Sequence, residues 1–504
     1  MCFRPRFTRP LGLLSVLLGC QVVQAEKPNI LLIISDDHTY AHTSMEGCAF
    51  VDTPHMEAVA NQGVYFAHAY ATSPGCSPSR ASILTGKYTW QLEEAGTHAS
   101  SFPTAYPVYP DLLEAHGYAV GFTGKGWGPG KWDVSGRTRN PAGPAYQAQS
   151  LAERRFTGST QTDYVANFRE FLETRPADAP FCFWLGTQEP HRPYERDSYT
   201  KLAKRLDTVD VPAFLPDSEA VRGDLLDYAV EIEYLDEVVG DALDLLRARG
   251  ELENTLIFIT ADNGMPFPRA KANCYDYGVR VPLVMRWDRQ LEAHRPMQAP
   301  VSLLDITYTI LTAAGVETAG LGLSGRNLLD VVQADEPAAR PVFAARERHS
   351  SSRYNNWTYP QRAMRQGDFL LIWNLKPTRY PAGDPLFYDA EGNLVTAYTD
   401  IDASPTKHGV LATPGSTYYA LAVGKRPAYE LYNVQVDPYC LHNLIGDPAY
   451  AQTERELVQE LTQYLVQTGD ARLVGDDPDI WEAYPRLSGP MRRFPAPEAT
   501  DAAN

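Results

Sequence analysis

Four short apolar runs in the N-terminal part of the sequence constrain its fold more strongly than any other feature. They are Ile30–Ile34, Ala119–Phe122, Phe181–Leu185 and Leu256–Ile259. Continuous apolar runs without alternation are typical of strands that are buried on both faces. Between them, apolar residues recur at helical spacing in Met56–Gln62 and, most clearly, in Leu225–Arg249. Strands that alternate with helices predict an α/β fold, with a mostly parallel sheet and helices on both of its faces.

Polar residues follow each of these runs. Asp36 and Asp37 come after the first run, Lys125 after the second, His191 after the third, and Asp262 and Asn263 after the fourth. Because ligands bind beyond the carboxyl ends of parallel strands, we expect these side chains to converge on one site. The carboxylates and the amide among them offer only oxygen ligands, which select calcium or magnesium over zinc.

The length of the chain predicts a second, smaller unit. Its 504 residues exceed the roughly 250–300 at which a single hydrophobic core stops growing. Composition changes near Ala334–Pro337, which has the character of a linker; beyond it, Phe369–Trp373 and Glu430–Tyr432 predict antiparallel strands and Thr453–Val466 a helix. The predicted division is an N-terminal catalytic domain (26–335), a C-terminal α+β subdomain with an antiparallel sheet (336–475) and a tail that wraps the surface or is loose (476–504).

Residues 1–25 have the pattern of a secretory signal peptide. Three arginines precede the apolar stretch Leu11–Val23, which is too short to span a bilayer, and Val23-Gln24-Ala25 fits a cleavage site. An alternative overlaps it, because Leu17-Leu18-Gly19-Cys20 resembles a lipoprotein site that would place a lipid anchor on Cys20. Both predict export, to the periplasm, the medium or the outer membrane as a lipoprotein. No later run approaches the ~18 apolar residues of a transmembrane helix.

Charge and cysteine content exclude some classes of protein. The formal net charge is −17, and loss of the three leader arginines would make it −20. Such an acidic chain is unsuited to binding a nucleic-acid backbone, although a local cationic pocket can still hold a small anion. Seven cysteines are too few for a disulfide framework in a chain of this length.

The most specific local motif is Cys76-Ser77-Pro78-Ser79-Arg80, which continues through Leu84-Thr85-Gly86. It resembles the signature of the sulfatase family, in which the cysteine is oxidised after synthesis to formylglycine. The resemblance extends over most of the chain, through Asp36-Asp37, Pro190-His191, Asp262-Asn263-Gly264, Glu430-Leu431-Tyr432 and Asp437-Pro438. Within the family, the segments most similar to the heparan N-sulfatase (sulfamidase) branch are Pro190-His191-Arg192, Asn263–Pro268 and Tyr359–Arg365. Each of these segments alone could be a helix cap, a turn or a buried thiol. These structural roles do not explain why all of the segments occur together in this order.

The resemblance implies an alkaline-phosphatase-like fold and a formylglycine nucleophile at a calcium site, with magnesium as the alternative metal. The implied metal ligands are Asp36, Asp37, Cys76, Asp262 and Asn263. Arg80 would orient the formylglycine, Lys125 and Lys271 would bind the sulfate, and His191 would donate a proton to the leaving sugar. A hydrated aldehyde suits this chemistry, because one hydroxyl attacks sulfur and the other expels sulfate by eliminating back to the aldehyde. A formylglycine-generating enzyme would be the maturation partner.

One position departs from the family pattern. The family usually has a histidine two residues after the first lysine, where it assists sulfate release, and this sequence has Trp127 there. Trp127 cannot exchange a proton; it would stack on a sugar ring or pack in the core. Other predicted substrate contacts are Arg192, Glu347, Arg348 and His349, and the alternative for this group is a cluster of salt bridges.

The function predicted from these residues is that of an exported sulfuric ester hydrolase. It would cleave a sulfate ester or N-sulfate from a terminal sugar of a sulfated oligosaccharide or polysaccharide. A terminal sugar is expected because the acidic surface cannot attract a polysulfated chain over long range. The alternatives are a phosphodiester or phosphonate monoester hydrolase of the alkaline phosphatase superfamily, and a non-catalytic protein that binds sulfated glycans.

Overall fold

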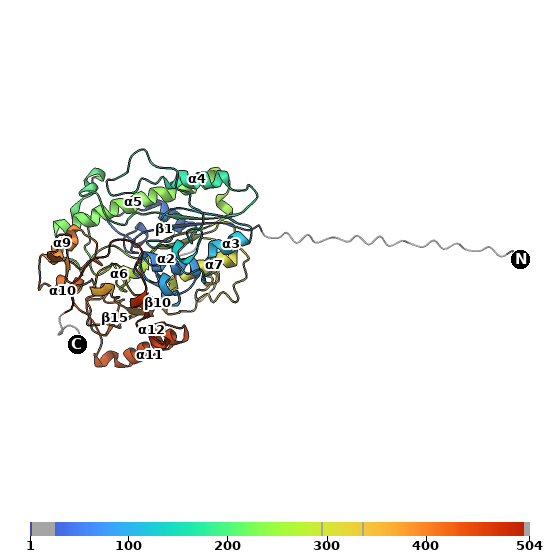
Figure 1. Ribbon diagram of the computed structural model, residues 1–504. Coiled ribbons are helices and arrows are strands. Elements are labelled where there is room, and N and C mark those ends of the chain that lie inside the picture. The colour runs from blue at the N-terminus through green and yellow to red at the C-terminus, as the bar shows by residue number, and fades with distance from the viewer. Residues whose placement is uncertain (3–25, 294–295, 335–336, 498–504) are drawn as a thin grey trace.

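The computed structural model describes residues 1–2, 26–293, 296–334 and 337–497. The remainder of the predicted signal peptide, the alternative lipid site Cys20 and the predicted domain boundary at residue 335 lie outside these residues. Within the described ranges, the chain forms two large sheets of different character with helices packed on both (Figure 1), and two smaller sheets, β13-β14 and β7-β3-β9.

The main sheet has the strand order β2-β8-β6-β1-β5-β4. These strands are β2 (Val64–Tyr65), β8 (Leu283–Arg286), β6 (Thr255–Ala261), β1 (Asn29–Ser35), β5 (Phe181–Gly186) and β4 (Ala119–Gly124). The four strands predicted from the apolar runs form its parallel part, β6-β1-β5-β4, which confirms the predicted fold class. At its edge, β8 pairs antiparallel with β6 and β2 pairs antiparallel with β8.

The register of the parallel strands aligns their carboxyl ends. Ser35 pairs with Ala261, Ile34 with Gly186, and Gly124 with the same Gly186. The residues that follow each strand therefore leave the sheet at one edge, as expected for a parallel sheet with a ligand site.

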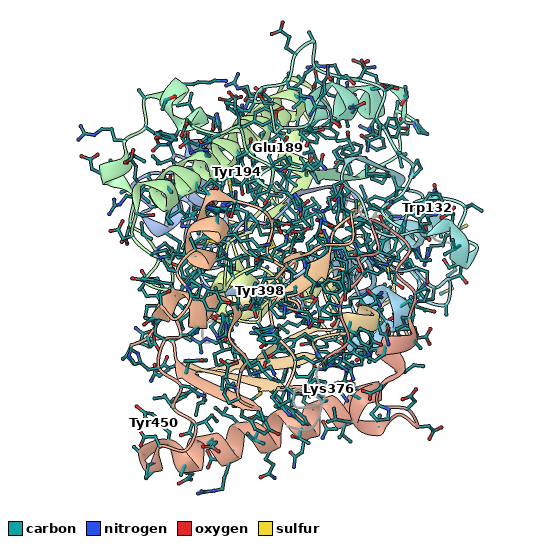
Figure 2. All side chains as sticks on the ribbon, turned by 60° about the vertical axis from the view of Figure 1, so that its left-hand side comes forward. Trp132, Glu189, Tyr194, Lys376, Tyr398 and Tyr450 are labelled. Carbon is teal, nitrogen blue, oxygen red and sulfur yellow. The ribbon has the colours of Figure 1, made fainter. Side chains whose placement is uncertain are left out.

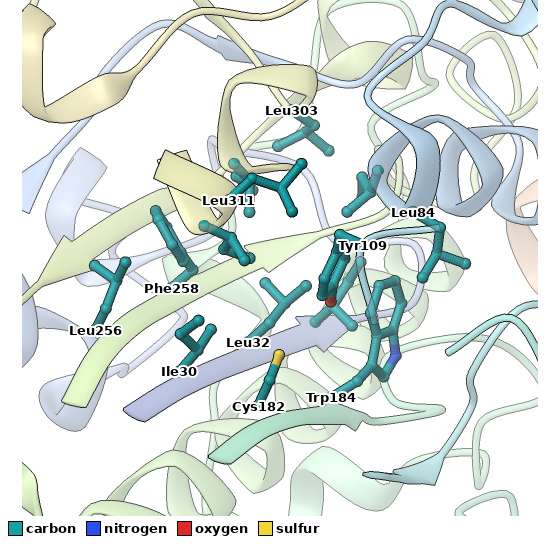
Figure 3. Packing of buried hydrophobic residues seen from close by; sticks show 14 of the residues in the cluster. Ile30, Leu32, Leu84, Tyr109, Cys182, Trp184, Leu256, Phe258, Leu303 and Leu311 are labelled. Atoms are coloured by element: carbon teal, nitrogen blue, oxygen red, sulfur yellow. The ribbon is translucent and has the colours of Figure 1, made fainter. Parts of the chain in front are cut away.

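Side chains of β1 alternate between two hydrophobic cores, one on each face of the sheet. Ile30, Leu32 and Ile34 belong to a core covered by α2 (Cys76–Thr85), α3 (Tyr109–Ala115), α7 (Leu304–Ala313) and α8 (Leu328–Gln333), part of which is drawn in Figure 3. Leu31 and Ile33 face a second core under α1 (Pro54–Asn61), α4 (Tyr164–Thr174) and α5 (Glu219–Ala248). Helices on both faces leave the end of the sheet as the accessible side.

The second sheet is antiparallel, with the order β10-β11-β12-β15. Its strands are β10 (Val342–Arg346), β11 (Gln361–Gln366), β12 (Phe369–Asn374) and β15 (Tyr429–Asn433). The strands predicted at Phe369–Trp373 and Glu430–Tyr432 are direct partners in this sheet. One face packs on α11 (Ala451–Gln467), which matches the helix predicted there, and the other face packs on Cys274 and Tyr275 of the N-terminal part.

The remaining strands and α-helices are short. They are β3 (Ala69–Tyr70), β7 (Arg280–Val281), β9 (Val301–Ser302), β13 (Leu386–Tyr388), β14 (Leu394–Thr396), α6 (Asp276–Val279), α9 (Pro405–Leu411), α10 (Thr417–Val423), α12 (Ala471–Val474) and α13 (Ile480–Ala483). In the C-terminal tail, Trp481 is buried and Leu487 N donates to Ala99 O at 2.6 Å. No helix in the described part of the chain has the length and apolarity needed to cross a membrane.

Candidate active site

Two consecutive carboxylates stand at the end of β1, at the centre of the sheet. Asp37 has a positive φ of 68°, a conformation that costs a residue with a side chain on the order of 1–3 kcal/mol. The backbone is held there because Asp37 N donates to Asp262 Oδ1 at 3.1 Å and Tyr228 donates to Asp37 O at 2.9 Å. This turn allows Asp36 and Asp37 to reach different cations of the same cluster.

Lys125 enters the cluster because two glycines allow the ends of β4 and β5 to approach closely. Gly124 has a φ of 67°, and a Cβ on it would lie 2.0 Å from Gly186 O. A Cβ on Gly186 would lie 2.0 Å from Lys125 O, while Lys125 N donates to Gly186 O at 2.7 Å. From this position Lys125 Nζ forms an ion pair with Asp36.

The first turn of α2 supplies the predicted nucleophile and its neighbouring arginine. Cys76 is the first residue of the helix, and Arg80 follows at the i+4 position on the same face. Arg80 Nε donates to Asp262 Oδ2 at 2.7 Å, and Arg80 Nη1 donates to Lys125 O at 2.6 Å. Arg80 therefore connects the helix to the end of β6 and to the end of β4.

Asp37 is the hub for the remaining residues. Lys271 Nζ donates to Asp37 Oδ1 at 2.5 Å, and Asn263 Nδ2 donates to the same oxygen at 2.7 Å. His191 Nε2 lies 3.7 Å from Asp37 Oδ2. The structure thus brings together all the residues that the sequence analysis associated with catalysis and metal binding; their individual roles stay predictions.

The cluster contains ligand atoms that suit a hard metal ion. Asp36 Oδ1 and Asn263 Oδ1 are buried and have no hydrogen-bond partner among the described residues. Possible ligand atoms of Asp36, Cys76 and Asp262 lie within 4.8 Å of one another, as do those of Asp36, Asp37 and His191. Buried acceptors without a partner are costly, and oxygens of this kind bind calcium or magnesium. The donor set therefore fits the predicted metal.

Burial and charge set the protonation states in this cluster. Burial alone would raise the pKa of Asp36, but the charges of Lys125 and His191 outweigh it and hold the pKa below its usual value. Burial, reinforced by the charge of Asp36, raises the pKa of Asp262 although Arg80 opposes the change. A divalent cation between these carboxylates would remove their mutual repulsion. Burial also raises the pKa of Cys76 to about 11, so its unmodified side chain is a thiol at neutral pH.

A residue that the sequence analysis missed, His98, contacts the predicted nucleophile. His98 Nε2 lies 3.4 Å from Cys76 Sγ, and its ring packs against that of His349 at a centroid distance of 4.7 Å. Burial, with His349 beside it, lowers the pKa of His98 well below its usual value. His98 lies in an irregular segment without a recognisable motif, so its placement depends on tertiary packing such as the bond from His98 N to Arg348 O.

Trp127 is packed in the core. Its side chain is 3% exposed, its Nε1 donates to Ser77 O at 3.0 Å, and its ring packs edge-on against Phe102 at 5.2 Å. These contacts favour the packing alternative and offer a sugar ring no open face.

The other predicted substrate contacts are mostly engaged in structural interactions. Arg192 forms a two-pronged ion pair with Asp224, at 2.7 and 2.8 Å, and Glu347 accepts from Arg362 and Arg472. Arg348 is buried and donates to Tyr484 O at 2.8 Å. His349 adjoins the centre through its contact with His98. These contacts support the salt-bridge alternative for Arg192 and Glu347, and direct binding of substrate by them stays a prediction.

The chain matches a protein-family model and curated relatives over most of its length. The family model, described as Sulfatase, matches residues 28–316. N-sulphoglucosamine sulphohydrolase of Homo sapiens is 29% identical over 510 residues, which cover 92% of this chain and 95% of that protein. An ulvan-active sulfatase of Formosa agariphila is 28% identical over 88% of this chain and 76% of its own length.

Solved structures share the fold. A protein solved with its substrate D-glucosamine-2-N,6-O-disulfate has a TM-score of 0.62 and 21% identity, covering 90% of this chain and 99% of its own. The phosphonate monoester hydrolase of Agrobacterium radiobacter also has a TM-score of 0.62, with 18% identity over 88% of this chain and 96% of its own. These similarities confirm the predicted alkaline-phosphatase-like architecture.

Proposed function

Because the chain belongs to the sulfatase family of sulfuric ester hydrolases, we propose that it is exported and removes a sulfate ester or N-sulfate from a terminal sugar of a sulfated glycan. The observation that carries this proposal is the convergence of carboxylates, lysines and Arg80 around Cys76, with buried acceptor oxygens left for a cation. Members of the family use a metal ion and a formylglycine, and each is considered below against the residues present.

Calcium is the proposed metal, with magnesium as the alternative. Asp36, Asp37, Asp262 and Asn263 would hold it, together with the modified side chain of Cys76. The three carboxylates are matched by three cations, Arg80, Lys125 and Lys271, so the cluster is formally neutral without metal. A bound divalent ion would supply positive charge to activate the nucleophile and to offset charge on the sulfate oxygens.

Cys76 is the proposed site of formylglycine. A buried thiol whose pKa lies near 11 is a poor nucleophile and a poor ligand for a hard cation. Oxidised to formylglycine and hydrated, the side chain would supply a hydroxyl nucleophile and a second hydroxyl for sulfate release. Arg80 fixes the geometry, because it ties the helix that carries Cys76 to Asp262 and to Lys125 O.

Lys125, Lys271 and His191 are proposed to bind the sulfate and the leaving group. The two ammonium groups are held by Asp36 and Asp37 on the two sides of the centre, and a compact ammonium suits a tetrahedral anion. His191 is 30% exposed and lies at the margin of the cluster, a position suited to donating a proton to a departing oxygen or nitrogen.

His98 is proposed to assist sulfate release at the step that the family histidine, replaced here by Trp127, usually serves. Its Nε2 is within hydrogen-bonding distance of the side-chain atom of Cys76. A neutral imidazole at this position can accept a hydrogen bond from the side chain of residue 76 and orient it.

The proposed substrates follow from the relatives. Curated relatives include human N-sulphoglucosamine sulphohydrolase and an N-acetylglucosamine-6-O-sulfatase of Bacteroides thetaiotaomicron. These names point to an N-sulfated or 6-O-sulfated glucosamine as the substrate class for this chain. A phosphonate monoester hydrolase stays the alternative, since two structural neighbours carry that name. The burial of Trp127 removes the open stacking face that would support a non-catalytic binding protein.

A desulfation screen tests the proposal. The protein, coexpressed with a formylglycine-generating enzyme, is incubated with N-sulfoglucosamine, glucosamine 6-sulfate, sulfated disaccharides and a phenylphosphonate monoester, and released sulfate or phenylphosphonate is measured. Sulfate release from a terminal sugar is expected. Faster turnover of the phosphonate than of every sulfated sugar would favour the alternative, and sulfate release from internal residues of an end-blocked polymer would overturn the terminal-sugar specificity.

A further inference from the structure

The charged cluster opens to solvent through few of its members. Among its described side chains, those of Asp36, Asp37 and Lys271 are at most 1% exposed, whereas Lys125 and His191 are 17% and 30% exposed. One further charged side chain reaches this opening: Asp402, which is 33% exposed and lies beside Lys271. Asp402 is thus a partly exposed carboxylate at the margin of the cluster that the sequence analysis did not identify.

Asp402 comes from a segment between β14 and α9, distant in sequence from the rest of the cluster. Its Oδ2 lies 3.9 Å from Lys271 Nζ, too far for a hydrogen bond, and has no hydrogen-bond partner within the described ranges. Burial would raise the pKa of Asp402, but the charges of Lys271 and His191 outweigh it and lower the pKa. Asp402 is therefore an ionised acceptor, and its buried Oδ2 is left without a hydrogen-bond partner among the described residues.

The segment that carries Asp402 is anchored on both sides. Before it, Asp400 accepts hydrogen bonds from Arg346 and Arg353, at 2.5 and 2.8 Å. After it, Thr406 Oγ1 donates to Asp224 Oδ2 at 2.6 Å, and Asp224 also holds Arg192. Figure 2 labels Tyr398 near the start of this segment, between Tyr194 and Lys376 in that view. Anchors on both sides indicate a fixed carboxylate rather than a mobile surface acid.

The charge of Asp402 opposes the binding of sulfate. Lys271 is already paired with Asp37, so a second carboxylate is not needed to neutralise its ammonium. A negative charge at the entrance also repels the anionic sulfate that Lys271 is proposed to bind. A hydrogen-bond donor on the same substrate would explain why a carboxylate stands here, because Asp402 could accept its hydrogen bond. Hydrogen bonds to an ionised acceptor are about twice as strong as neutral ones.

We infer that Asp402 is a specificity-determining residue that accepts a hydrogen bond from a hydroxyl or amino group of the sulfated sugar ring. It would favour sugars with a donor beside the scissile sulfate and disfavour rings with a carboxylate or a second sulfate at that position. This inference rests on the proposed sulfatase function and specifies the substrate class of the same site.

The test compares Asp402→Asn and Asp402→Ala with the wild-type protein on two kinds of substrate. The sugar probes are N-sulfoglucosamine and glucosamine 6-sulfate, and the reference is p-nitrophenyl sulfate, whose ring carries no donor. We expect the ratio of kcat/KM for sugar to kcat/KM for aryl sulfate to fall about 10- to 100-fold in the alanine variant, and less in the asparagine variant. Asp241→Asn, on the exposed face of α5, is the matched control and should leave the ratio as it is.

A second measurement needs no variant. Monodeoxy analogues of the sugar probes, tested on the wild-type protein, should show one hydroxyl or amino group whose removal causes a similar loss, and Asp402→Ala should be insensitive to that removal. An unchanged ratio in the variants, with kcat/KM falling equally for both kinds of substrate, would overturn the inference. Asp402 would then act only through the charge that it places beside Lys271. Absence of sulfate release by the wild-type protein from every probe would instead overturn the proposed function, and the role of Asp402 with it.

Discussion

Two buried clusters of charge in this protein have similar composition and very different bonding. The active-site cluster contains Asp36, Asp37 and Asp262 with Arg80, Lys125 and Lys271. The C-terminal arginine network contains Glu347, Asp400 and Asp470 with Arg346, Arg353, Arg362 and Arg472. Both are almost fully buried, and both tie together segments that are distant in the sequence.

The clusters differ in how completely their acceptors are used. In the C-terminal arginine network, both oxygens of Glu347 accept from arginines, and both oxygens of Asp470 accept from Arg362. In the active-site cluster, Asp36 Oδ1 and Asn263 Oδ1 have no such partner in the described part of the chain. A network with satisfied acceptors can only stabilise the fold, whereas one with unused acceptors can bind a cation and a substrate. Substitutions in the two clusters should therefore have separable effects.

The largest expected effect comes from Cys76→Ala, which removes the proposed nucleophile. Turnover should fall by roughly 10⁴-fold or more, as when a covalent nucleophile is deleted, while the melting temperature changes little because only the terminal group of one small side chain is lost. Sulfate release and thermal unfolding measure the two quantities. Cys182→Ala, a matched change of a buried cysteine in β5, should keep its activity; comparable loss in both variants would mean that Cys76 acts through packing.

Asp262→Asn tests the metal assignment within the active-site cluster. The variant keeps the size of the side chain but removes a negative charge, so we expect metal affinity to fall by at least about 100-fold, with a parallel loss of activity. Metal content after dialysis and reactivation by added calcium or magnesium are the measurements. Full calcium binding by the variant, or reactivation of chelated wild-type protein by zinc alone, would contradict the oxygen-ligand site.

Asp470→Asn makes the same chemical change in the C-terminal arginine network and should affect stability instead. It leaves the fully buried Arg362 with one fewer anionic partner, and breaking a buried pair costs about 3–5 kcal/mol. Denaturant unfolding measures this loss, and activity per folded molecule should be retained. Loss of metal or turnover by this variant without loss of stability would contradict the separate roles of the two clusters.

The smallest effect is expected from His98→Gln, at the edge of the active-site cluster. Loss of a single hydrogen bond to the side chain of residue 76 should slow turnover about 10-fold. If His98 acts in sulfate release, the variant should show a burst of leaving-group release followed by slow turnover. The exposed His116→Gln is the control, and equal slowing of burst and steady state would place His98 in an earlier step.

The sequence predicted the sheet well where apolar runs are continuous and end in polar residues. β1, β4, β5 and β6 satisfy both conditions, and the register that aligns Ser35 with Ala261 explains why their polar successors meet. In the two large sheets, β2, β8, β10 and β11 were not predicted. β2 is a two-residue edge strand, and its pairing with β8 depends on tertiary contacts rather than on a local pattern.

The substrate side of the site was predicted less well than the metal side. The aspartates and Cys76 belong to motifs, so their neighbours in the chain reveal them. Glu347 was expected to contact the substrate, but its carboxylate forms an ion pair with Arg472, which is 125 residues away in the sequence. No local sequence pattern predicts that pair. Asp402 and His98 lie on irregular segments whose positions depend on contacts made by distant parts of the chain.

The mass of the peptide that contains residue 76 tests the central claim most directly. The protein, coexpressed with a formylglycine-generating enzyme, is digested with trypsin, and the peptide that ends at Arg80 is examined by mass spectrometry. The account predicts a loss of about 18 Da at residue 76, the change from a thiol to an aldehyde, in the fraction that releases sulfate. An intact thiol at Cys76 in protein that turns over sulfated sugars at full rate would contradict it.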